Sequence, residues 1–237
     1  DDVQRAADRE AAQLRHVQRL GDDALSTECR VAVHDHGQHE ARVGIDDGVG
    51  EEADRSLTQS PLGIAELGLG GVQGLPRAVV DALTGESTAI KLDKGFTDAL
   101  TALKLTPGVV GSAKLEAGSL IFPITGGNVT VFKQGEVSPY VIGQIQHEGS
   151  GLSLSAGGTK VELTNFNVDP GSSKVYGDVT VNGKVAATSA FLFSLDGRTL
   201  KPLAMEGSNA VLEGTRVAIS PVAAPVLNKV FKTNAVK

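Results

Sequence analysis

Residues 160–168 read KVELTNFNV, a stretch in which apolar and polar side chains alternate. Val161 and Leu163 fall on one side of an extended chain, and Phe166 and Val168 return to that side after a break at Thr164-Asn165. Alternation with a period of two is typical of a strand that buries one face. The stretch therefore predicts a half-buried antiparallel strand with a bulge near Asn165.

Turn residues that tolerate positive φ lie on both sides of this strand. Ala156-Gly157-Gly158-Thr159 precedes it, and Asn182-Gly183 separates two later apolar runs, which is typical of tight hairpins. Short alternating runs recur between glycine turns from Ser87 onward. We predict strands at Ala113–Leu115, Ser119–Ile124, Asn128–Phe132, Val141–His147, Leu152–Ser155, Lys160–Val168, Lys174–Val181 and Ala210–Ile219.

Two short amphipathic helices interrupt the β pattern. Asp93 is placed to cap a helix over residues 94–104, and Ser220-Pro221 is placed to begin a helix that runs to Phe231. The apolar stripes expected to face a sheet are Phe96, Leu100 and Leu103 in the first helix and Val222, Val226 and Val230 in the second.

The composition changes near residue 78. Residues 1–78 hold eight Arg, fifteen Asp and Glu, four of the five His, and no Lys, Phe or Tyr. Residues 79–237 hold all twelve Lys, two Arg, thirteen Asp and Glu, and every aromatic residue, so the net charge is −7 for the first part and +1 for the second. A segment with so few large apolar side chains buries too little surface to offset its ordering entropy.

We therefore predict a mainly β fold: an antiparallel β sandwich or barrel-like domain at 79–237 with two short amphipathic helices, preceded by a poorly structured N-terminal segment at 1–78. Two interpretations of that segment stay open. It is either a disordered acidic arm or the product of translating a GC-rich gene in the wrong frame or strand, in which case the true N-terminus is missing. No signal peptide is recognised at the start of the chain.

Several classes of function are disfavoured by what the chain lacks. The net charge is −6 and no Lys/Arg cluster occurs, which argues against a nucleic-acid surface. No apolar run is long enough to span a bilayer, so no transmembrane segment is expected. The single cysteine, Cys29, forbids an intrachain disulfide. The β part has one histidine and no cysteine, and neither a nucleophile elbow nor a phosphate-binding loop is present, so no catalytic residue is assigned.

Two sets of polar residues are candidates for a site. His34, His36 and His39 have spacing that suits zinc or copper, but they lie in the segment least able to fix ligand geometry, so no metal site is expected. A hydrolase that uses paired carboxylates is the alternative from a different class. Its candidate residues are Glu116, Glu136, Glu148, Glu162, Asp169 and Asp178, which are scattered singly through the β part.

The order of motifs in the β part resembles the HtaA-like domain family, the β-rich envelope modules of Gram-positive bacteria. The resemblance covers about residues 85–195. The matching segments are Gly95-Phe96 at the first helix, LIFPITGG at 120–127, Gly143-x-Ile145-x-His147-x-Gly149, LSLS at 152–155 and Val161-x-Leu163-x-Asn165-Phe166-x-Val168.

This resemblance implies secretion or attachment to the cell envelope, and characterised members bind haem for an iron-uptake system. It also implies that a tyrosine near the first helix ligates the iron while a strand-end histidine supports it. His147 matches the supporting histidine, whereas residues 94–104 contain no tyrosine; Tyr140 and Tyr176 are the only phenols. We therefore assign His147 and Tyr140 as candidate ligand-binding residues.

These observations predict a non-enzymatic, secreted or cell-envelope β domain with a binding or structural role and no cofactor. The alternative is a haem-binding module that uses His147 and Tyr140. Its partners are unknown, with cell-envelope components or haem as the candidates.

Overall fold

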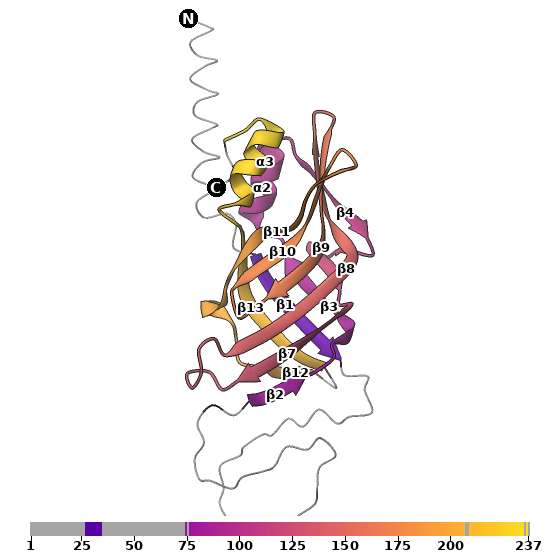
Figure 1. Ribbon diagram of the computed structural model, residues 1–237. Helices are drawn as coiled ribbons and strands as arrows, with labels where there is room; N and C mark the ends of the chain where they lie inside the picture. Colours follow the sequence, from indigo (N-terminus) through magenta and orange to yellow (C-terminus); the bar gives the residue numbers. More distant parts are fainter. Residues whose placement is uncertain (1–26, 35–73, 75, 207–208, 235, 237) are drawn as a thin grey trace, which may run out of the picture.

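The computed structural model describes residues 27–34, 74, 76–206, 209–234 and 236, and these form a mainly β body with two helices (Figure 1). The strands are β1 (Thr27–His34), β2 (Pro76–Val80), β3 (Thr84–Lys91), β4 (Thr106–Gly111), β5 (Lys114–Glu116), β6 (Ser119–Pro123), β7 (Gly126–Phe132), β8 (Val141–Ala156), β9 (Thr159–Asp169), β10 (Lys174–Val181), β11 (Lys184–Asp196), β12 (Ala204–Glu206) and β13 (Asn209–Ile219). The helices are α2 (Lys94–Ala102), α3 (Ala223–Phe231) and the short 3-10 helix η1 (Gly197–Thr199).

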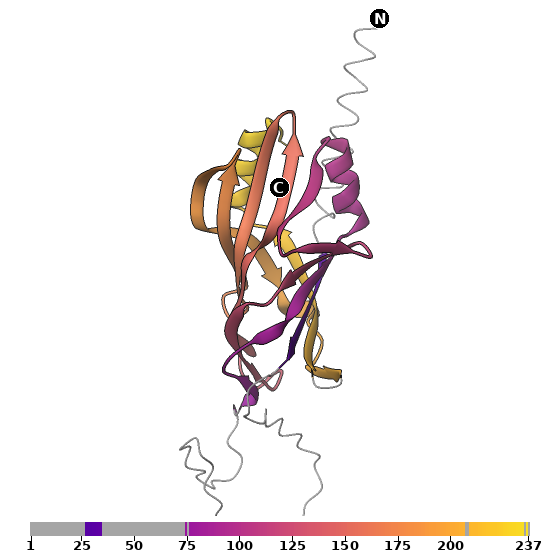
Figure 2. The same ribbon diagram turned by 90° about the vertical axis from the view of Figure 1, so that its right-hand side faces the viewer.

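All the strands belong to one curled antiparallel sheet, which confirms the predicted fold class. Its order is β2-β7-β8-β9-β10-β11-β13-β1-β3-β6-β5, with β12 added to β13 and β4 added to the far half of β8. The sheet wraps round to form a half-barrel, and α2 and α3 lie at one end of it (Figure 2). We call this end, with the adjoining tip of the β10–β11 hairpin, the helix end.

The predicted hairpins are present. Gly157 and Gly158 have φ of 54° and 80° between β8 and β9, and Asn182 and Gly183 have φ of 48° and 76° between β10 and β11. Positive φ at both central residues matches the right-handed twist of the flanking strands. The turn chemistry therefore fixes the register in which β8 to β11 pair.

A row of bulges crosses four neighbouring strands at one level. The β8–β9 register shifts between His147 and Gly151, opposite Asn165, whose φ is 54° as expected for the predicted bulge. Asn165 accepts a hydrogen bond from the Gly149 N–H at 2.9 Å and donates one to Asp178 at 2.9 Å. Asp178 in turn accepts from the Ser189 N–H at 3.0 Å, at a shift in the β10–β11 register. Side chains of Asn165 and Asp178 thus hold the bulges in line.

Helix α2 begins where the sequence predicts. The Asp93 side chain accepts a hydrogen bond from the Gly95 N–H at 2.6 Å, which satisfies one of the free donors of the first turn. Leu100 is the buried residue of this helix, and Phe96 and Leu103 pack beside it.

Helix α3 faces the sheet with a different side from the one predicted. Ser220 does accept a hydrogen bond from the Ala223 N–H, at 3.0 Å, but the helix begins only at Ala223. Its buried residues are Ala223, Ala224 and Leu227. Of the predicted stripe, Val230 packs against the core, while Val222 and Val226 are 57% and 51% exposed. The small alanine side chains let the helix approach the sheet closely, and this turns the two valines outward.

Strand β1 departs from the expectation that residues 1–78 are unstructured. It lies between β13 and β3 and pairs antiparallel with both. Residues 1–78 hold too few large apolar side chains to bury much surface by themselves. A strand inserted between two others instead satisfies its N–H and C=O groups on both sides with partners from the rest of the chain.

The expected boundary at residue 78 also falls inside β2, which begins at Pro76. The other residues before Gly74 lie outside the described residues.

Because β1 is an internal strand, a chain that begins at Val79 is expected to melt at least about 5 °C below the full chain or to fail to fold. Circular dichroism melting measures this. Val31→Pro in the full chain should reproduce much of the loss, since proline removes a ladder donor. Unchanged melting of both proteins would show that β1 contributes nothing.

Candidate functional site

His147 lies at the centre of the structure. It points inward from β8 and is only 1% exposed, although the sequence placed it at the end of a strand. Its Nδ1 lies 2.9 Å from the carbonyl oxygen of Pro123, and its Nε2 lies 3.1 Å from the Thr88 hydroxyl, which is also buried. Both ring nitrogens are therefore engaged.

These partners define the protonation state of the ring. A carbonyl oxygen only accepts, so Nδ1 carries the proton, and the Thr88 hydroxyl donates to an unprotonated Nε2. Burial lowers the pKa of His147 because it penalises the charged form, and this outweighs the opposing effect of the Pro123 and Phe122 backbone groups. The imidazole is neutral at neutral pH.

The two hydrogen bonds of His147 join strands from distant parts of the sheet order. Thr88 belongs to β3 and Pro123 to β6, whereas β8 lies near the opposite end of the order. Backbone bonds at the same level support this link, from Thr125 N–H to the Gln146 carbonyl at 2.8 Å and from Leu83 N–H to the Gly127 carbonyl at 2.9 Å. The histidine therefore closes the half-barrel from within.

Aromatic rings continue the core away from His147. Phe122 meets the imidazole edge-on with ring centroids 6.3 Å apart, and it meets Phe166 at 5.3 Å and an interplanar angle of 88°. Phe166 then packs on Phe193 at 5.9 Å. Edge-to-face pairs of this kind are favourable beyond simple burial of area.

A cavity of about 120 Å³ lies beside His147, between the walls of the half-barrel. Its polar lining residues are Thr88, His147 and Thr215. The rest of the lining is apolar: Val31, Ile90, Leu92, Phe96, Leu120, Phe122, Val141, Ile145, Leu152, Phe166, Val168, Pro170, Val175, Phe193, Leu195, Leu200, Leu212, Val217 and Ile219. Such a lining favours an apolar occupant over ordered water.

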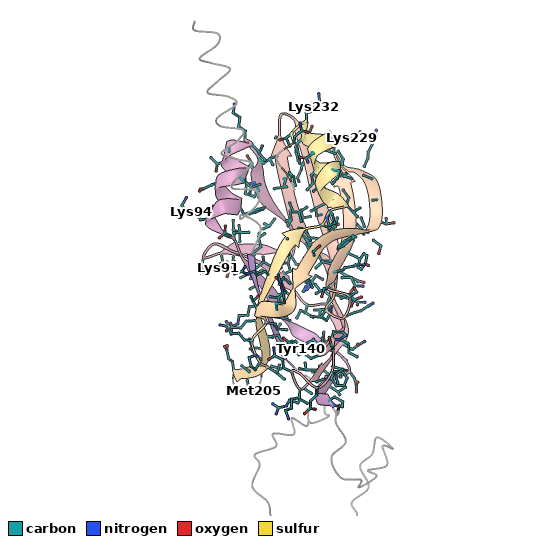
Figure 3. The ribbon with its side chains drawn as sticks, turned by 90° about the vertical axis from the view of Figure 1, so that its left-hand side faces the viewer. Lys91, Lys94, Tyr140, Met205, Lys229 and Lys232 are labelled. Carbon is teal, nitrogen blue, oxygen red and sulfur yellow. The ribbon has the colours of Figure 1, made fainter. Side chains whose placement is uncertain are left out.

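Tyr140, the other candidate, lies elsewhere. It precedes β8 and packs against a second apolar cluster that includes Leu83, Val129 and Val141. Figure 3 shows it in the half of the molecule away from the helices. Its hydroxyl is buried and finds no hydrogen-bond partner among the described residues, and burial raises the pKa of this phenol. Seven residues of extended chain span about 23 Å, so Tyr140 and His147 do not form one site.

The site does not fit haem as the resemblance implies. Both nitrogens of His147 are engaged, Tyr140 is remote, and the cavity of about 120 Å³ is small. Pockets that enclose larger organic ligands typically measure about 300–1,000 Å³. Tyr176 offers no substitute, since its ring packs against Phe191 at a centroid distance of 6.0 Å.

Most of the six candidate carboxylates hold ordinary surface partners. Ion pairs or backbone bonds engage Glu116 with Lys114, Glu136 with Lys133, Glu162 with Lys160, and Asp169 with the Ser172 N–H. Glu148 and Asp178 do line one polar depression on the outer surface, beside Asn165. Both oxygens of Asp178 already accept hydrogen bonds that stabilise the bulges, so it is a structural acceptor there.

The histidine cluster is not assembled in the described part of the chain. His34 ends β1, while His36 and His39 lie outside the described residues. Among the residues that the structure describes, no group of three or more potential metal ligands occurs.

No protein-family model, curated protein or solved structure matches this chain. None of the described helices has the length and apolar character needed to cross a bilayer.

Replacing Thr88 by valine should destabilise the protein by about 1–3 kcal/mol, because the buried Nε2 of His147 loses its donor while the side-chain shape is kept. Chemical denaturation measures the change. Thr106→Val on the exposed face of β4 is the matched control and is expected to stay within about 0.5 kcal/mol. Equal stability of the two variants would show that the hydrogen bond between Thr88 and His147 does not stabilise the protein.

Because the pKa of His147 is lowered in the folded protein, the free energy of unfolding should decrease as the solution is made more acidic. The unfolded chain binds a proton as the pH drops through the usual value of 6.5, whereas the folded chain resists it, so stability is complete above that pH and declines below it. The slope for one proton is at most about 1.4 kcal/mol per pH unit.

His147→Asn, which cannot titrate, should show a flatter profile in denaturant titrations between neutral and mildly acidic pH. Parallel profiles for the two proteins would mean that His147 is not the group responsible.

Proposed function

We propose that this protein is a non-enzymatic binding domain whose half-barrel holds a small apolar molecule next to Thr88 and His147. The observation that carries the proposal is the cavity itself, which combines a nearly continuous apolar lining with one buried polar pair. A concave apolar site with few polar groups is the usual form of a small-molecule pocket.

The size of the cavity limits the ligand. An engineered apolar cavity of about 150 Å³ in another protein stays dry and binds benzene or xenon. The cavity here, at about 120 Å³, suits a ligand of about one ring or a short branched chain. Larger molecules would require the walls to move apart.

The Thr88 hydroxyl favours a ligand that carries one hydrogen-bond donor. Its hydroxyl proton is used by His147, but its oxygen keeps lone pairs that can accept a hydrogen bond. A ligand hydroxyl would satisfy this acceptor, so an apolar molecule with a single donor, such as a phenol, should bind better than its hydrocarbon analogue.

The engaged state of His147 supports a binding role over catalysis. A general base needs a nitrogen that can reach a reacting proton, whereas here both nitrogens hold structural partners. Secretion or attachment to the cell envelope remains a prediction from the resemblance. Haem binding is less well supported, for the reasons of size and ligation given above.

Benzene and phenol are the probes that test this proposal. At about ten times its dissociation constant, each should raise the melting temperature by a few degrees, because it binds the folded state alone. Thr88→Val should abolish the advantage of phenol over benzene.

A variant whose cavity is filled by a larger side chain gives the decisive comparison with the unmodified protein. Val168 lines the cavity and packs both on the core around Phe122 and Phe166 and on the cluster around Leu83 and Val129. Val168→Phe should therefore remove the response to either probe. Val79→Phe, at a valine that is 46% exposed on β2, should keep it. No response in the unmodified protein, or a response that survives Val168→Phe, would overturn the proposal.

A further inference from the structure

The helix end exposes apolar side chains next to lysines. Val222 and Val226, one turn apart, are 57% and 51% exposed at α3, and Lys229 and Lys232 follow on the same helix and its C-cap. The tip of the β10–β11 hairpin lies at this end too (Figure 1), and its Val185 is 70% exposed beside Lys184. These valines do not pack in the core, so the stability of the fold does not explain why they are apolar.

The charge at this end is positive and uncompensated. In the part of the chain that the structure describes, Lys104, Lys184, Lys229 and Lys232 form no ion pair. Other lysines are neutralised locally, as in the pairs Lys94–Asp98 and Lys160–Glu162. After Glu213 the sequence contains no further acidic residue. Figure 3 shows Lys229 and Lys232 at the tip of this end and Lys94 beside α2, with Lys91 nearer the middle of the molecule.

From this arrangement we propose that the helix end docks on an anionic lipid surface. Lysines are attracted to acidic headgroups, and apolar side chains between them gain by entering the boundary between headgroups and acyl chains. A soluble polyanion would use the lysines but offers nothing to Val222 and Val226. The combination of the two features therefore selects a lipid surface.

The anchoring of α3 suits this role. Ala223, Ala224 and Leu227 hold its opposite face against the sheet, so Val222, Val226 and Lys229 are presented on a fixed support. Little conformational entropy is then lost when the surface binds. The proposal does not depend on whether the cavity binds a ligand.

Co-sedimentation of the full chain tests the proposal, with phosphatidylcholine vesicles that contain or lack phosphatidylglycerol. Binding is expected only to the anionic vesicles and should weaken with added salt. Lys229→Gln with Lys232→Asn should reduce the affinity about twenty-five-fold, at about fivefold per lysine. Asparagine is chosen at position 232 because Lys232 has a φ of 53°, which asparagine tolerates.

Val222→Ser with Val226→Ser should reduce the affinity about tenfold without changing the melting temperature, since both side chains are exposed. The matched control is Arg77→Gln with Val79→Ser, on exposed positions of β2 at the opposite end (Figure 1), and it should leave binding within about twofold.

Absence of binding to anionic vesicles would overturn the proposal. So would a serine double variant that binds as well as the unmodified chain, because the interaction would then be purely electrostatic. Equal competition by dextran sulfate in that case would identify a soluble polyanion as the partner class.

Discussion

One buried imidazole connects two parts of the sheet that are far apart in its strand order. His147 donates from Nδ1 to Pro123 and accepts at Nε2 from Thr88, so β8 is held to β6 and β3 across the interior. In a dry core each of these bonds is costly to lose, since the freed group finds no water. The curvature of the wall, the packing of Phe122 and the cavity beside it all depend on this closure.

Local patterns in the sequence predict those strands, turns and helix ends that depend only on neighbouring residues. The alternation at 160–168, the paired turn residues at 157–158 and 182–183, and the cap at Asp93 each specify structure within a few residues. β11 shows no such signal, because the side chains of residues 184–189 are exposed on both faces and therefore do not alternate. The sequence predicts two strands at 141–147 and 152–155, because Gly149-Ser150-Gly151 resembles a turn. The structure has one continuous strand, β8, with a bulge at this position.

The site depended on contacts that no local pattern reveals. His147 is recognisable from the sequence as an unusual residue, but its partners lie 59 and 24 positions away. Thr88 stands among Ser87, Ala89 and Ile90 without any mark of its role. Tyr140 is close to His147 in sequence, yet the extended chain between them carries it to another part of the core. Residues a few positions apart in an extended chain lie far apart in space, because the chain advances about 3.3 Å per residue.

The row of bulges held by Asn165 and Asp178 divides a single sheet into two regions whose strand registers are set separately. Above it, the strands support α2 and α3; below it, they curve round the cavity. An interrupted ladder does not transmit a shift in register, because the extra residue on each bulged strand absorbs it. The side chains do not share this division, because Phe96 of α2 lines the cavity, and Ala223 and Leu227 of α3 pack in the same core cluster as Phe122 and Phe166. A substitution that reshapes the pocket is therefore transmitted to both helices through the core, even where the strand registers stay fixed.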